Sequence, residues 1–410
     1  MGNGRVIIVG GGIGGLTMAL AAQRAGLEAR VFERAPNIEA VQVGSGITIY
    51  GNAMRVYREL GAMEAMRANG GVVEWQDFYS WKGRKLGRWE SGELAQRARA
   101  INLSAPRGVL HKALLERLEP GTVECCNACT GFEESGDSVT AHFEDGSNAE
   151  GDVLIGADGF GSVIRPQLLG DEGRKYRYAG LTSWNAVVDF DHEPTHGVQA
   201  SVYGRGSRFL WVHLGDGRVG WVAAAMAPEG ESDPPEGTRS SLIERFRDWA
   251  SPVPEMIAAS DERGIRRLDV VDREPVTRWG RGRVTLMGDA AHPMTFFLGQ
   301  GACSAIEDAF VLGRRMRIHG ATPEALRAYE AARIENANWT VKASWRLGKL
   351  VAIRSRVGSA TRNAGVKAMS PLMFNRLIGR VDQLAREEDA AFAAAEASND
   401  RASAPEHAQP

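Results

Sequence analysis

The sequence predicts an α/β fold in which a parallel sheet flanked by helices is interrupted by a mostly antiparallel sheet and followed by C-terminal helices. Three observations predict it. The chain opens with an apolar stretch, a glycine-rich turn and an alanine-rich stretch, the order of a βαβ unit. From about residue 180 to 275, strand patterns replace helix patterns. Beyond residue 300, helical patterns return and continue to about residue 395.

The first part of the chain carries the clearest elements. We expect a fully apolar strand at 6–9, a helix at 16–25 that Gly26 ends, and a second strand at 28–33. Further expected elements are helices at 52–60 and 107–118 and strands within 72–90, 122–134, 138–144, 152–156 and 283–287.

The middle of the chain reads as a second sheet inserted into the first part. Its expected strands are 182–190, 197–203, 209–214 and 218–225, with one helix at 240–249. Asp216-Gly217 between the last two strands is typical of a hairpin turn. The expected domains are 1–71 with 100–179 and 276–335, then 72–99 with 180–275, then C-terminal helices at 336–397 and a disordered polar tail at 398–410.

Composition excludes several classes of protein. A net charge of −2 over 410 residues gives no positive field for nucleic acid. No apolar run approaches the roughly 20 residues that a membrane span needs, and no secretion signal precedes the first strand, so we expect a cytoplasmic location. Cys125, Cys126 and Cys129 include a CxxC spacing, but strand residues three apart point to opposite faces, which argues against a metal site.

A glycine-rich turn joins the first expected strand to the first helix. Gly10 permits the tight turn, Gly12 allows a pyrophosphate to approach the backbone, and Gly15 lets helix and strand pack closely. Ile13 and Gly14 complete a turn whose free N–H groups favour phosphate. Glu33, about 20 residues further on and followed by Arg34, stands where such sites place the acid that binds ribose hydroxyls. This pattern predicts a bound dinucleotide.

Two further glycine-marked segments make the prediction specific. One is Gly156-Ala157-Asp158-Gly159-Phe160-Gly161-Ser162-Val163-Ile164-Arg165. The other runs from Gly288-Asp289-Ala290-Ala291-His292-Pro293 to Gly299-Gln300-Gly301, with Ala302 opening a helix. The order of the three segments indicates one cofactor held by separated pieces of chain.

With these motifs, residues 5–380 resemble the class A flavoprotein monooxygenases, which include salicylate, 3-hydroxybenzoate and 4-hydroxybenzoate hydroxylases. The resemblance implies a Rossmann-like FAD-binding domain in which Asp289 holds the ribityl chain and Arg107 contacts FAD. It implies that Asp158 lies near the pyrophosphate and an NAD(P)H contact region, and that Gly46 lies beside the isoalloxazine ring.

Gly299, Gly301 and Ala302 precede or open a helix whose N-terminus offers free N–H groups. Reduced flavin is an anion at its N1–C2=O edge, and a positive helix end there stabilises it. One departure from the family lies just upstream. Where relatives commonly have a proline, this loop carries Phe296 and Phe297, which form an aromatic wall facing the substrate or pack in the core.

The inserted sheet is expected to supply the substrate pocket. On the strand at 209–213, Trp211 and His213 share one face and Arg208 belongs to the other, and the sequence leaves open which face looks inward. His213 is a candidate general base for a phenolic substrate, or a surface histidine. Trp184 and Trp221 are candidate pocket residues, and Arg208 is a candidate partner for a substrate carboxylate.

The resemblance implies a monooxygenase that uses NADH or NADPH and O2 to hydroxylate an aromatic or heteroaromatic small molecule through a C4a-hydroperoxyflavin. Epoxidation and decarboxylative hydroxylation share that intermediate. One alternative is an oxygen-independent FAD reductase or dehydrogenase on the same fold. A flavin halogenase is disfavoured because no Trp-x-Trp-x-Ile-Pro motif is present. We expect a monomer or homodimer with no metal, no nucleic acid and no stable membrane association.

Overall fold

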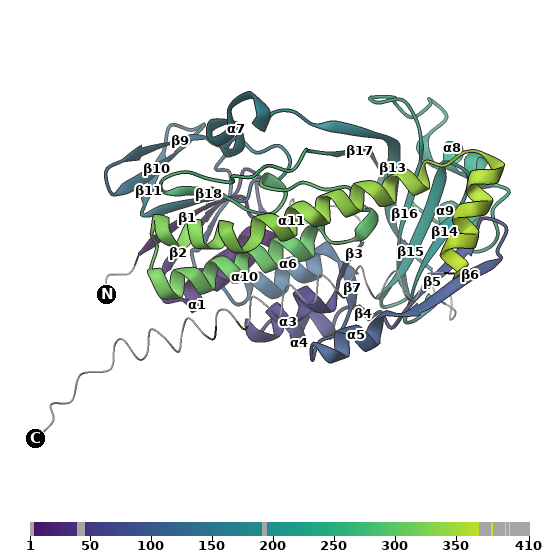
Figure 1. Cartoon of the computed structure of the whole chain (residues 1–410), viewed down its shortest axis with the longest axis horizontal. Coiled ribbons are helices and arrows are strands. Elements are labelled where there is room, and N and C mark those ends of the chain that lie inside the picture. The colour runs from purple at the N-terminus through teal and green to yellow at the C-terminus, as the bar shows by residue number, and fades with distance from the viewer. Residues whose placement is uncertain are drawn as a thin grey trace, which may run out of the picture.

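The computed structural model describes residues 4–38, 46–190 and 195–368, with three isolated helical positions beyond them. The expected helices beyond residue 368 and the expected disordered tail therefore lie almost entirely outside the described residues. The described part is elongated, with a sheet at each end and a layer of helices between and in front of them (Figure 1).

A five-stranded parallel sheet forms one end. Its order is β18 (Val284–Leu286), β12 (Val153–Gly156), β1 (Arg5–Val9), β2 (Glu28–Phe32) and β8 (Val123–Glu124). The central strands are almost wholly apolar because both faces of the sheet are covered. One face of this sheet is covered by three helices, which are seen in Figure 1: α1 (Ile13–Arg24), α10 (Gly301–His319) and α11 (Pro323–Val351).

A small antiparallel sheet covers the other face of the parallel sheet. It contains β9 (Cys129–Ser135), β10 (Ser138–Phe143) and β11 (Asn148–Gly151). Its inward residues Val139, Ala141 and Phe143 share one apolar core with β1 and β12. The predicted strand at 122–134 is therefore two strands, β8 and β9, which belong to different sheets.

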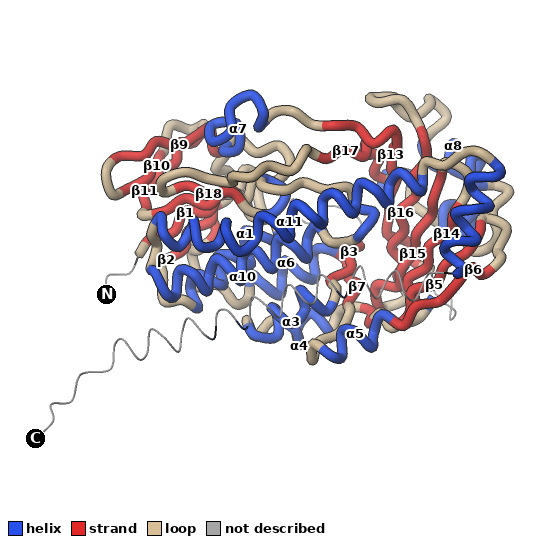
Figure 2. The backbone as a smooth tube through the Cα atoms, viewed as in Figure 1, coloured by secondary structure: helices blue, strands red, loops and turns tan. Residues whose placement is uncertain are grey.

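A seven-stranded sheet forms the other end of the molecule (Figure 2). Its order is β17 (Arg266–Asp272), β13 (Arg177–Asp189), β16 (Arg218–Met226), β15 (Ser207–Gly215), β14 (Val198–Tyr203), β5 (Trp75–Ser80) and β6 (Lys85–Glu90). All neighbours are antiparallel except β14 and β5. Helices α8 (Thr238–Phe246) and α9 (Val253–Ala258) pack on one face. The sequence did not indicate α9 because six residues that include Pro254 carry too little periodicity.

A third sheet lies between the two ends. It contains β3 (Gly46–Ile49), β7 (Leu103–Pro106) and β4 (Gly71–Val72). This sheet is surrounded by four helices: α3 (Gly51–Glu59), α4 (Met63–Arg67), α5 (Ser91–Arg97) and α6 (Arg107–Leu115). The remaining short helices are α7 (Ile164–Leu169), η1 (Gly170–Gly173), η3 (Glu262–Gly264), η4 (Gly288–Ala290) and η5 (Phe296–Leu298).

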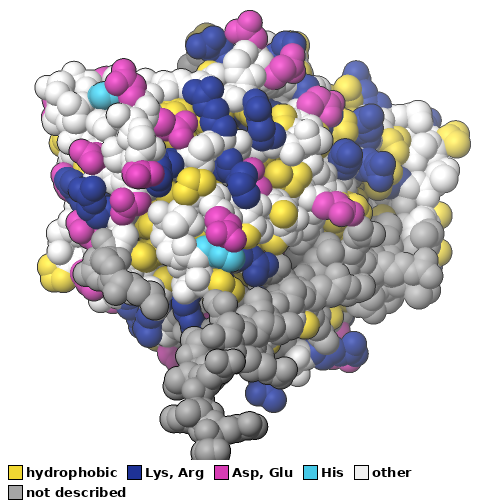
Figure 3. All heavy atoms as spheres, turned by 60° about the vertical axis from the view of Figure 1, so that its left-hand side comes forward, with side chains coloured by type: hydrophobic (Ala, Val, Ile, Leu, Met, Phe, Trp, Pro, Cys, Tyr) yellow, Lys and Arg dark blue, Asp and Glu magenta, His cyan; other side chains and the backbone are white. Residues whose placement is uncertain are grey.

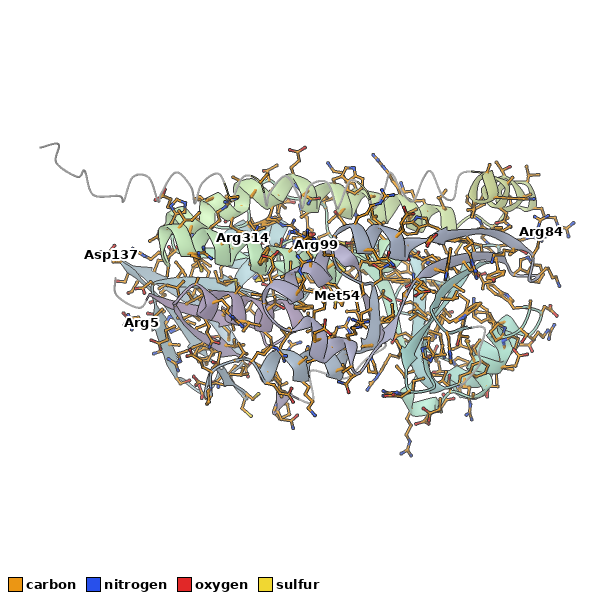
Figure 4. All side chains as sticks on the ribbon, turned by 90° about the horizontal axis from the view of Figure 1, so that it is seen from below. Arg5, Met54, Arg84, Arg99, Asp137 and Arg314 are labelled. Carbon is orange, nitrogen blue, oxygen red and sulfur yellow. The ribbon has the colours of Figure 1, made fainter. Side chains whose placement is uncertain are left out.

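Helix α11 runs most of the length of the molecule and connects its two ends (Figure 4). In that view Arg5 and Asp137 mark one end and Arg84, on the turn between β5 and β6, marks the other. Near the seven-stranded sheet, the Arg177 guanidinium pairs with Asp272 on β17 and lies 4.1 Å from the centre of the Trp345 ring on α11. This contact fixes the helix to the edge of the sheet, and helical residues 356–368 follow.

The predicted α/β fold with parallel and antiparallel sheets and C-terminal helices is confirmed; its division into domains stays a prediction. Acidic and basic side chains are interspersed over the face drawn in Figure 3. Within the described ranges, every helix is too short or too polar to cross a bilayer.

Candidate active site

The three glycine-marked segments meet at one edge of the parallel sheet. Strands β18, β12 and β1 are direct neighbours and run in the same direction, so their carboxyl ends lie side by side. Gly10 follows β1, Ala157 follows β12 and Gly288 follows β18 closely. Ligands of open α/β sheets bind at this edge.

Close contacts of glycines join the segments. A Cβ atom on Gly10 would lie 2.4 Å from the Ala157 carbonyl oxygen, and the backbone there has a φ of +110°. A Cβ atom on Gly14 or on Gly288 would lie 3.2 or 3.1 Å from the Ala305 Cβ atom on α10. The first segment therefore packs directly against the other two.

Gly15 and Gly12 differ in what surrounds them. A Cβ atom on Gly15 would lie 2.0 Å from the Gly10 carbonyl oxygen, so only glycine closes this turn. A Cβ atom on Gly12 would meet no atom of the described ranges within 4 Å. Gly12 faces open space at the N-terminus of α1, and the buried Ile13 is the first residue of that helix. The turn therefore provides an exposed backbone next to a helix end that attracts phosphate.

Glu33 lies at the end of β2 and is buried. One carboxylate oxygen accepts a hydrogen bond of 2.6 Å from the Gly11 N–H and the other accepts one of 2.9 Å from the Ala35 N–H. Glu33 thus holds the glycine-rich turn in place, while its remaining lone pairs are free to accept from a ligand. The neighbouring Arg34 is exposed.

The second segment contacts the loop of the third. The Asp158 carboxylate accepts a hydrogen bond of 2.8 Å from the Val163 N–H, and its other oxygen has no partner among described residues. The buried Arg165 guanidinium donates to the carbonyl oxygens of Ala290 and Ala291 at 2.8 and 2.6 Å. Arg165 therefore fixes the loop that contains Asp289.

Asp289 and Arg107 face the same cavity from opposite segments. Both residues are exposed, and neither side chain forms a hydrogen bond or an ion pair with another described residue. Surrounding protein still desolvates both groups. Burial raises the pKa of the Asp289 carboxyl, although His292 and Arg107 oppose this effect, and burial lowers the pKa of Arg107. Two such groups without partners indicate a polar ligand that contacts both.

A buried ionic network supports this loop from behind. Asp308 on α10 lies 2.5 Å from His292 Nε2 and 2.8 Å from Arg333 Nε on α11, and it accepts a hydrogen bond from the Gly288 N–H at 3.0 Å. Arg333 also lies 3.2 Å from Glu307. Although burial alone raises the pKa of Asp308, the charges and hydrogen bonds of His292 and Arg333 lower it to about 2. The network joins the loop to both long helices.

A cavity of about 360 Å³ lies between these segments and the seven-stranded sheet. From the nucleotide side it is lined by Gly46, Arg107, Asp289, Gly299, Gly301 and Ala302. Gly301 and Ala302 are the first two residues of α10, whose N-terminal N–H groups have no partner within the helix. A Cβ atom on Gly46 would lie 2.5 Å from Leu214 Cδ2, so a glycine is needed where β3 approaches β15.

The sheet presents Arg208, Leu210 and Val212 to the cavity, which decides the question that the sequence left open. Arg208 is buried; its terminal nitrogen donates to Ser201 Oγ at 2.8 Å, and its Nε atom has no partner among described residues. This buried donor is the main cationic group on the sheet side of the cavity.

The structure does not bring His213, Trp211 or Trp184 to this cavity. Alternate residues of a strand point to opposite faces, and these three belong to the far face. The His213 ring lies 4.3 Å from that of His196, Trp184 donates to Asp233, and Trp211 lines a separate cavity of about 220 Å³. The proposed pocket roles of these three residues therefore have no support, and we propose no acid–base role for His213.

The other aromatic candidates border the cavity. Trp221 adjoins it, but its indole stacks on Phe209 and donates to Ser260, so the ring belongs to the core of the far face. Phe296 and Phe297 both line the cavity. Phe296 is half-buried, whereas Phe297 is buried against Gly348 of α11.

Sequence reasoning missed most of the remaining wall. Tyr50, Gln199 and Ser201 line the cavity, and Gln199 donates to the Tyr50 hydroxyl at 3.1 Å. The alternation of Gln199, Ser201 and Tyr203 in an otherwise apolar strand was an available signal. The cavity-lining residues of α11 and of the helical segment 356–368 carried no such signal in the sequence, because only the fold brings them to the cavity.

The residues present fit FAD. Gly12 leaves space beside a helix N-terminus, and Asp289 and Arg107 face the cavity. Neither of these two side chains, nor the buried Gln300 Nε2, has a partner among described residues. Fold and site together define a flavin-dependent enzyme with a substrate cavity between two sheets.

The chain belongs to the FAD binding domain family, whose profile matches residues 3–344. It is 37% identical over 345 residues to the aurachin C monooxygenase/isomerase of Stigmatella aurantiaca, covering 84% of this chain and 89% of that protein. It is 35% identical over 335 residues to the FAD-dependent urate hydroxylase of Klebsiella pneumoniae, covering 81% and 86%.

The fold is similar to the crystal structure of Klebsiella pneumoniae HpxO complexed with FAD and uric acid. The TM-score is 0.85 at 30% identity, over 93% of this chain and 97% of that one. These findings confirm the predicted family and the FAD cofactor, and they establish the chain as an FAD-dependent monooxygenase. Neither named relative supports the oxygen-independent alternative.

Proposed function

We propose that this enzyme uses NADH or NADPH and O2 to hydroxylate an aromatic or heteroaromatic small molecule. The observation that carries the proposal is the single cavity that joins Arg107, Asp289 and the start of α10 to the polar face of the seven-stranded sheet. The names of the urate hydroxylase and of the aurachin C monooxygenase support a ring substrate. The balanced reaction consumes the ring compound, NAD(P)H, a proton and O2 and yields the hydroxylated ring, NAD(P)⁺ and water.

Several of the predicted cofactor-binding residues have a role in this proposal. Gly12 and the N-terminus of α1 would contact the pyrophosphate near Asp158, Glu33 would accept from ribose hydroxyls, and Asp289 would hold the ribityl chain. When bound, FAD supplies hydride acceptance from NAD(P)H and activation of O2.

The protein's part is to bind, orient and stabilise charge. The N–H groups at Gly301 and Ala302 present the positive end of α10 to the cavity and would stabilise negative charge on bound flavin. Phe296 and Phe297 line the cavity and limit water there. Arg208 is placed to bind a carboxylate, phenolate or carbonyl oxygen of the ring compound, because its buried Nε–H needs an acceptor.

The proposal is tested with purified, FAD-loaded protein and a set of aromatic acids and heteroaromatic compounds under ¹⁸O2. We expect NAD(P)H oxidation to rise with a compound that acquires one ¹⁸O atom. Reduction or dehydrogenation of the compound without ¹⁸O would overturn the monooxygenase assignment, and halide-dependent product would indicate a halogenase.

Replacing Asp289 by asparagine is expected to raise the Kd for FAD by about 10–100-fold, because a hydrogen bond to a charged group is lost. The apoprotein is expected to be as stable as the wild type or more stable at neutral pH. Burial raises the pKa of this carboxyl, so ionised Asp289 opposes folding above its unfolded pKa and asparagine does not. Flavin fluorescence titration and thermal unfolding measure both quantities. Asp171→Asn, at a 95% exposed carboxylate, is the control, and an unchanged Kd for Asp289→Asn would remove this residue from the site.

Replacing Arg208 by glutamine is expected to raise the KM for an anionic ring substrate by about 10–100-fold, because a buried charged hydrogen bond is lost. The Kd for FAD should change little, because Arg208 lies on the sheet side of the cavity. Arg205→Gln, an exposed arginine on the adjacent turn that does not line this cavity, is the matched control. Equal KM values for both variants would contradict the role of Arg208.

A further inference from the structure

Two large hydrophobic side chains that line the cavity are exposed to solvent. Among the large hydrophobic side chains that are exposed, Leu268 is 60% and Leu350 is 40% exposed, and both line the cavity. Single exposed leucines are ordinary on protein surfaces. Two that line the same cavity and are both exposed to solvent point to an apolar opening, through which an apolar group passes from the cavity to the surface.

The two leucines come from different elements. Leu268 lies on β17, at the end of the strand order, opposite Ser183 of β13. Because Ser183 lines the cavity and paired residues point to the same face, the Leu268 side chain lies on the cavity side of the sheet edge. Leu350 lies one residue before the end of α11. The opening is therefore framed by a sheet edge and a helix end.

An apolar wall continues inward from this opening. Leu347 and Val351 of α11 line the cavity with Phe296 and Phe297, and these four residues belong to one apolar cluster. The opposite wall carries polar groups, which include Asn185, Ser201 and Arg208. A molecule that satisfies both walls has a polar ring at the buried end and an apolar surface that follows α11 outward.

The volume of the cavity also indicates that a long substituent on the ring has to extend out of it. About 360 Å³ has to accommodate both the flavin ring and the reacting ring, and small-molecule sites span roughly 300–1,000 Å³. A substituent longer than a few atoms therefore cannot fold back inside and has to leave through the opening.

We propose that the substrate is amphipathic: an aromatic ring with a polar or anionic group, carrying an apolar chain that leaves the cavity between Leu268 and Leu350. The proposal rests on the proposed function and adds the substrate class. The chain transfers apolar surface from water onto the two leucines, so each methylene that reaches them tightens binding.

The probe is salicylate with straight alkyl chains of increasing length on the ring, bound to the FAD-loaded enzyme. Binding is measured from the change in flavin absorption, and product is measured by mass under ¹⁸O2. We expect the Kd to fall by about threefold for each methylene over the part of the chain that contacts the leucines, then to level off. The ratio of the Kd of the shortest to that of the longest compound is the readout.

Leu268→Asp and Leu350→Asp are expected to reduce that ratio at least about tenfold. Val357→Asp is the matched control: Val357 is 78% exposed and apolar but does not line the cavity, so its ratio should equal that of the wild type. Leu268→Met is a second control: it keeps an apolar surface, so the dependence of the Kd on the length of the alkyl chain should be retained.

The outcomes separate this inference from the proposed function. Oxygen transfer to the short compound with no chain-length dependence overturns the inference alone, as does a dependence that Leu268→Asp and Leu350→Asp leave unchanged. Chain-length-dependent binding without transfer of ¹⁸O to any compound overturns the proposed function alone. If no compound in the series perturbs the flavin, both fail.

Discussion

Replacing Gly12 by alanine is expected to raise the Kd for FAD by roughly 100-fold, about 2.7 kcal/mol, without destabilising the apoprotein. Among the described residues, no atom lies within 4 Å of a Cβ atom at Gly12, and the backbone there is extended, so the methyl group is not expected to oppose folding. The space that the methyl group enters is the space where the pyrophosphate must approach the backbone. Flavin titration and denaturant unfolding of the apoprotein measure the two effects.

Gly15→Ala is the informative contrast. Its Cβ atom would lie 2.0 Å from the Gly10 carbonyl oxygen, so β1 and α1 have to separate, which costs about 3 kcal/mol or more of folding free energy. Gly365→Ala, also in open space but on the distant helical segment 356–368, should change neither FAD binding nor folding adversely. If Gly12→Ala binds FAD as tightly as Gly365→Ala does, the dinucleotide does not lie at this turn.

Replacing Asp308 by asparagine is expected to lower the free energy of unfolding by about 3–5 kcal/mol. The carboxylate is fully buried and lies against both His292 and Arg333, so its removal leaves Arg333 with Glu307 as its remaining anionic partner. The loop that carries Asp289 loses its anchor, so FAD binding should weaken as well. Denaturant unfolding checks the stability, and Asp137→Asn, at a fully exposed carboxylate that pairs with Arg283, should show no measurable change.

The same residue predicts a dependence on pH. His292 and Arg333 lower the pKa of Asp308 from 3.8 to about 2, so the stabilisation is fully present above about pH 4 and is lost as the pH falls from 4 towards 2. The stabilisation that corresponds to this lowered pKa is about 2 kcal/mol. The wild type should therefore lose stability more steeply than Asp308→Asn in this window. Parallel acid profiles of the two proteins would contradict the network as described.

The predictable part of the site follows from local rules. A strand followed by Gly10, Gly12 and Gly15 requires a particular turn, and the turn specifies its ligand through backbone geometry that the residues themselves impose. The later segments were recognisable for the same reason, because Gly156 ends one strand of the parallel sheet and Gly288 closely follows the end of another. Adjacent parallel strands then bring these ends together.

The substrate-facing residues of the cavity could not be predicted from local sequence rules of this kind. Strand alternation showed that Arg208 and His213 lie on opposite faces, but the choice of face depends on what packs against the sheet. Helices α8 and α9 cover the face of Trp211, which leaves Arg208 to the cavity. Neither helix is adjacent to β15 in the sequence. The six residues of α9 are too few to show a helical periodicity.

The sequence by itself determined the family, the cofactor and the turns that hold it, because backbone conformations that only glycine allows are encoded residue by residue. Tertiary structure decided which face of the seven-stranded sheet faces the cavity, and that Phe296, Phe297, Leu268 and Leu350 line it. These features arise where elements that are not adjacent in the sequence pack together, and side-chain burial between them is a property of the assembled core rather than of any local segment.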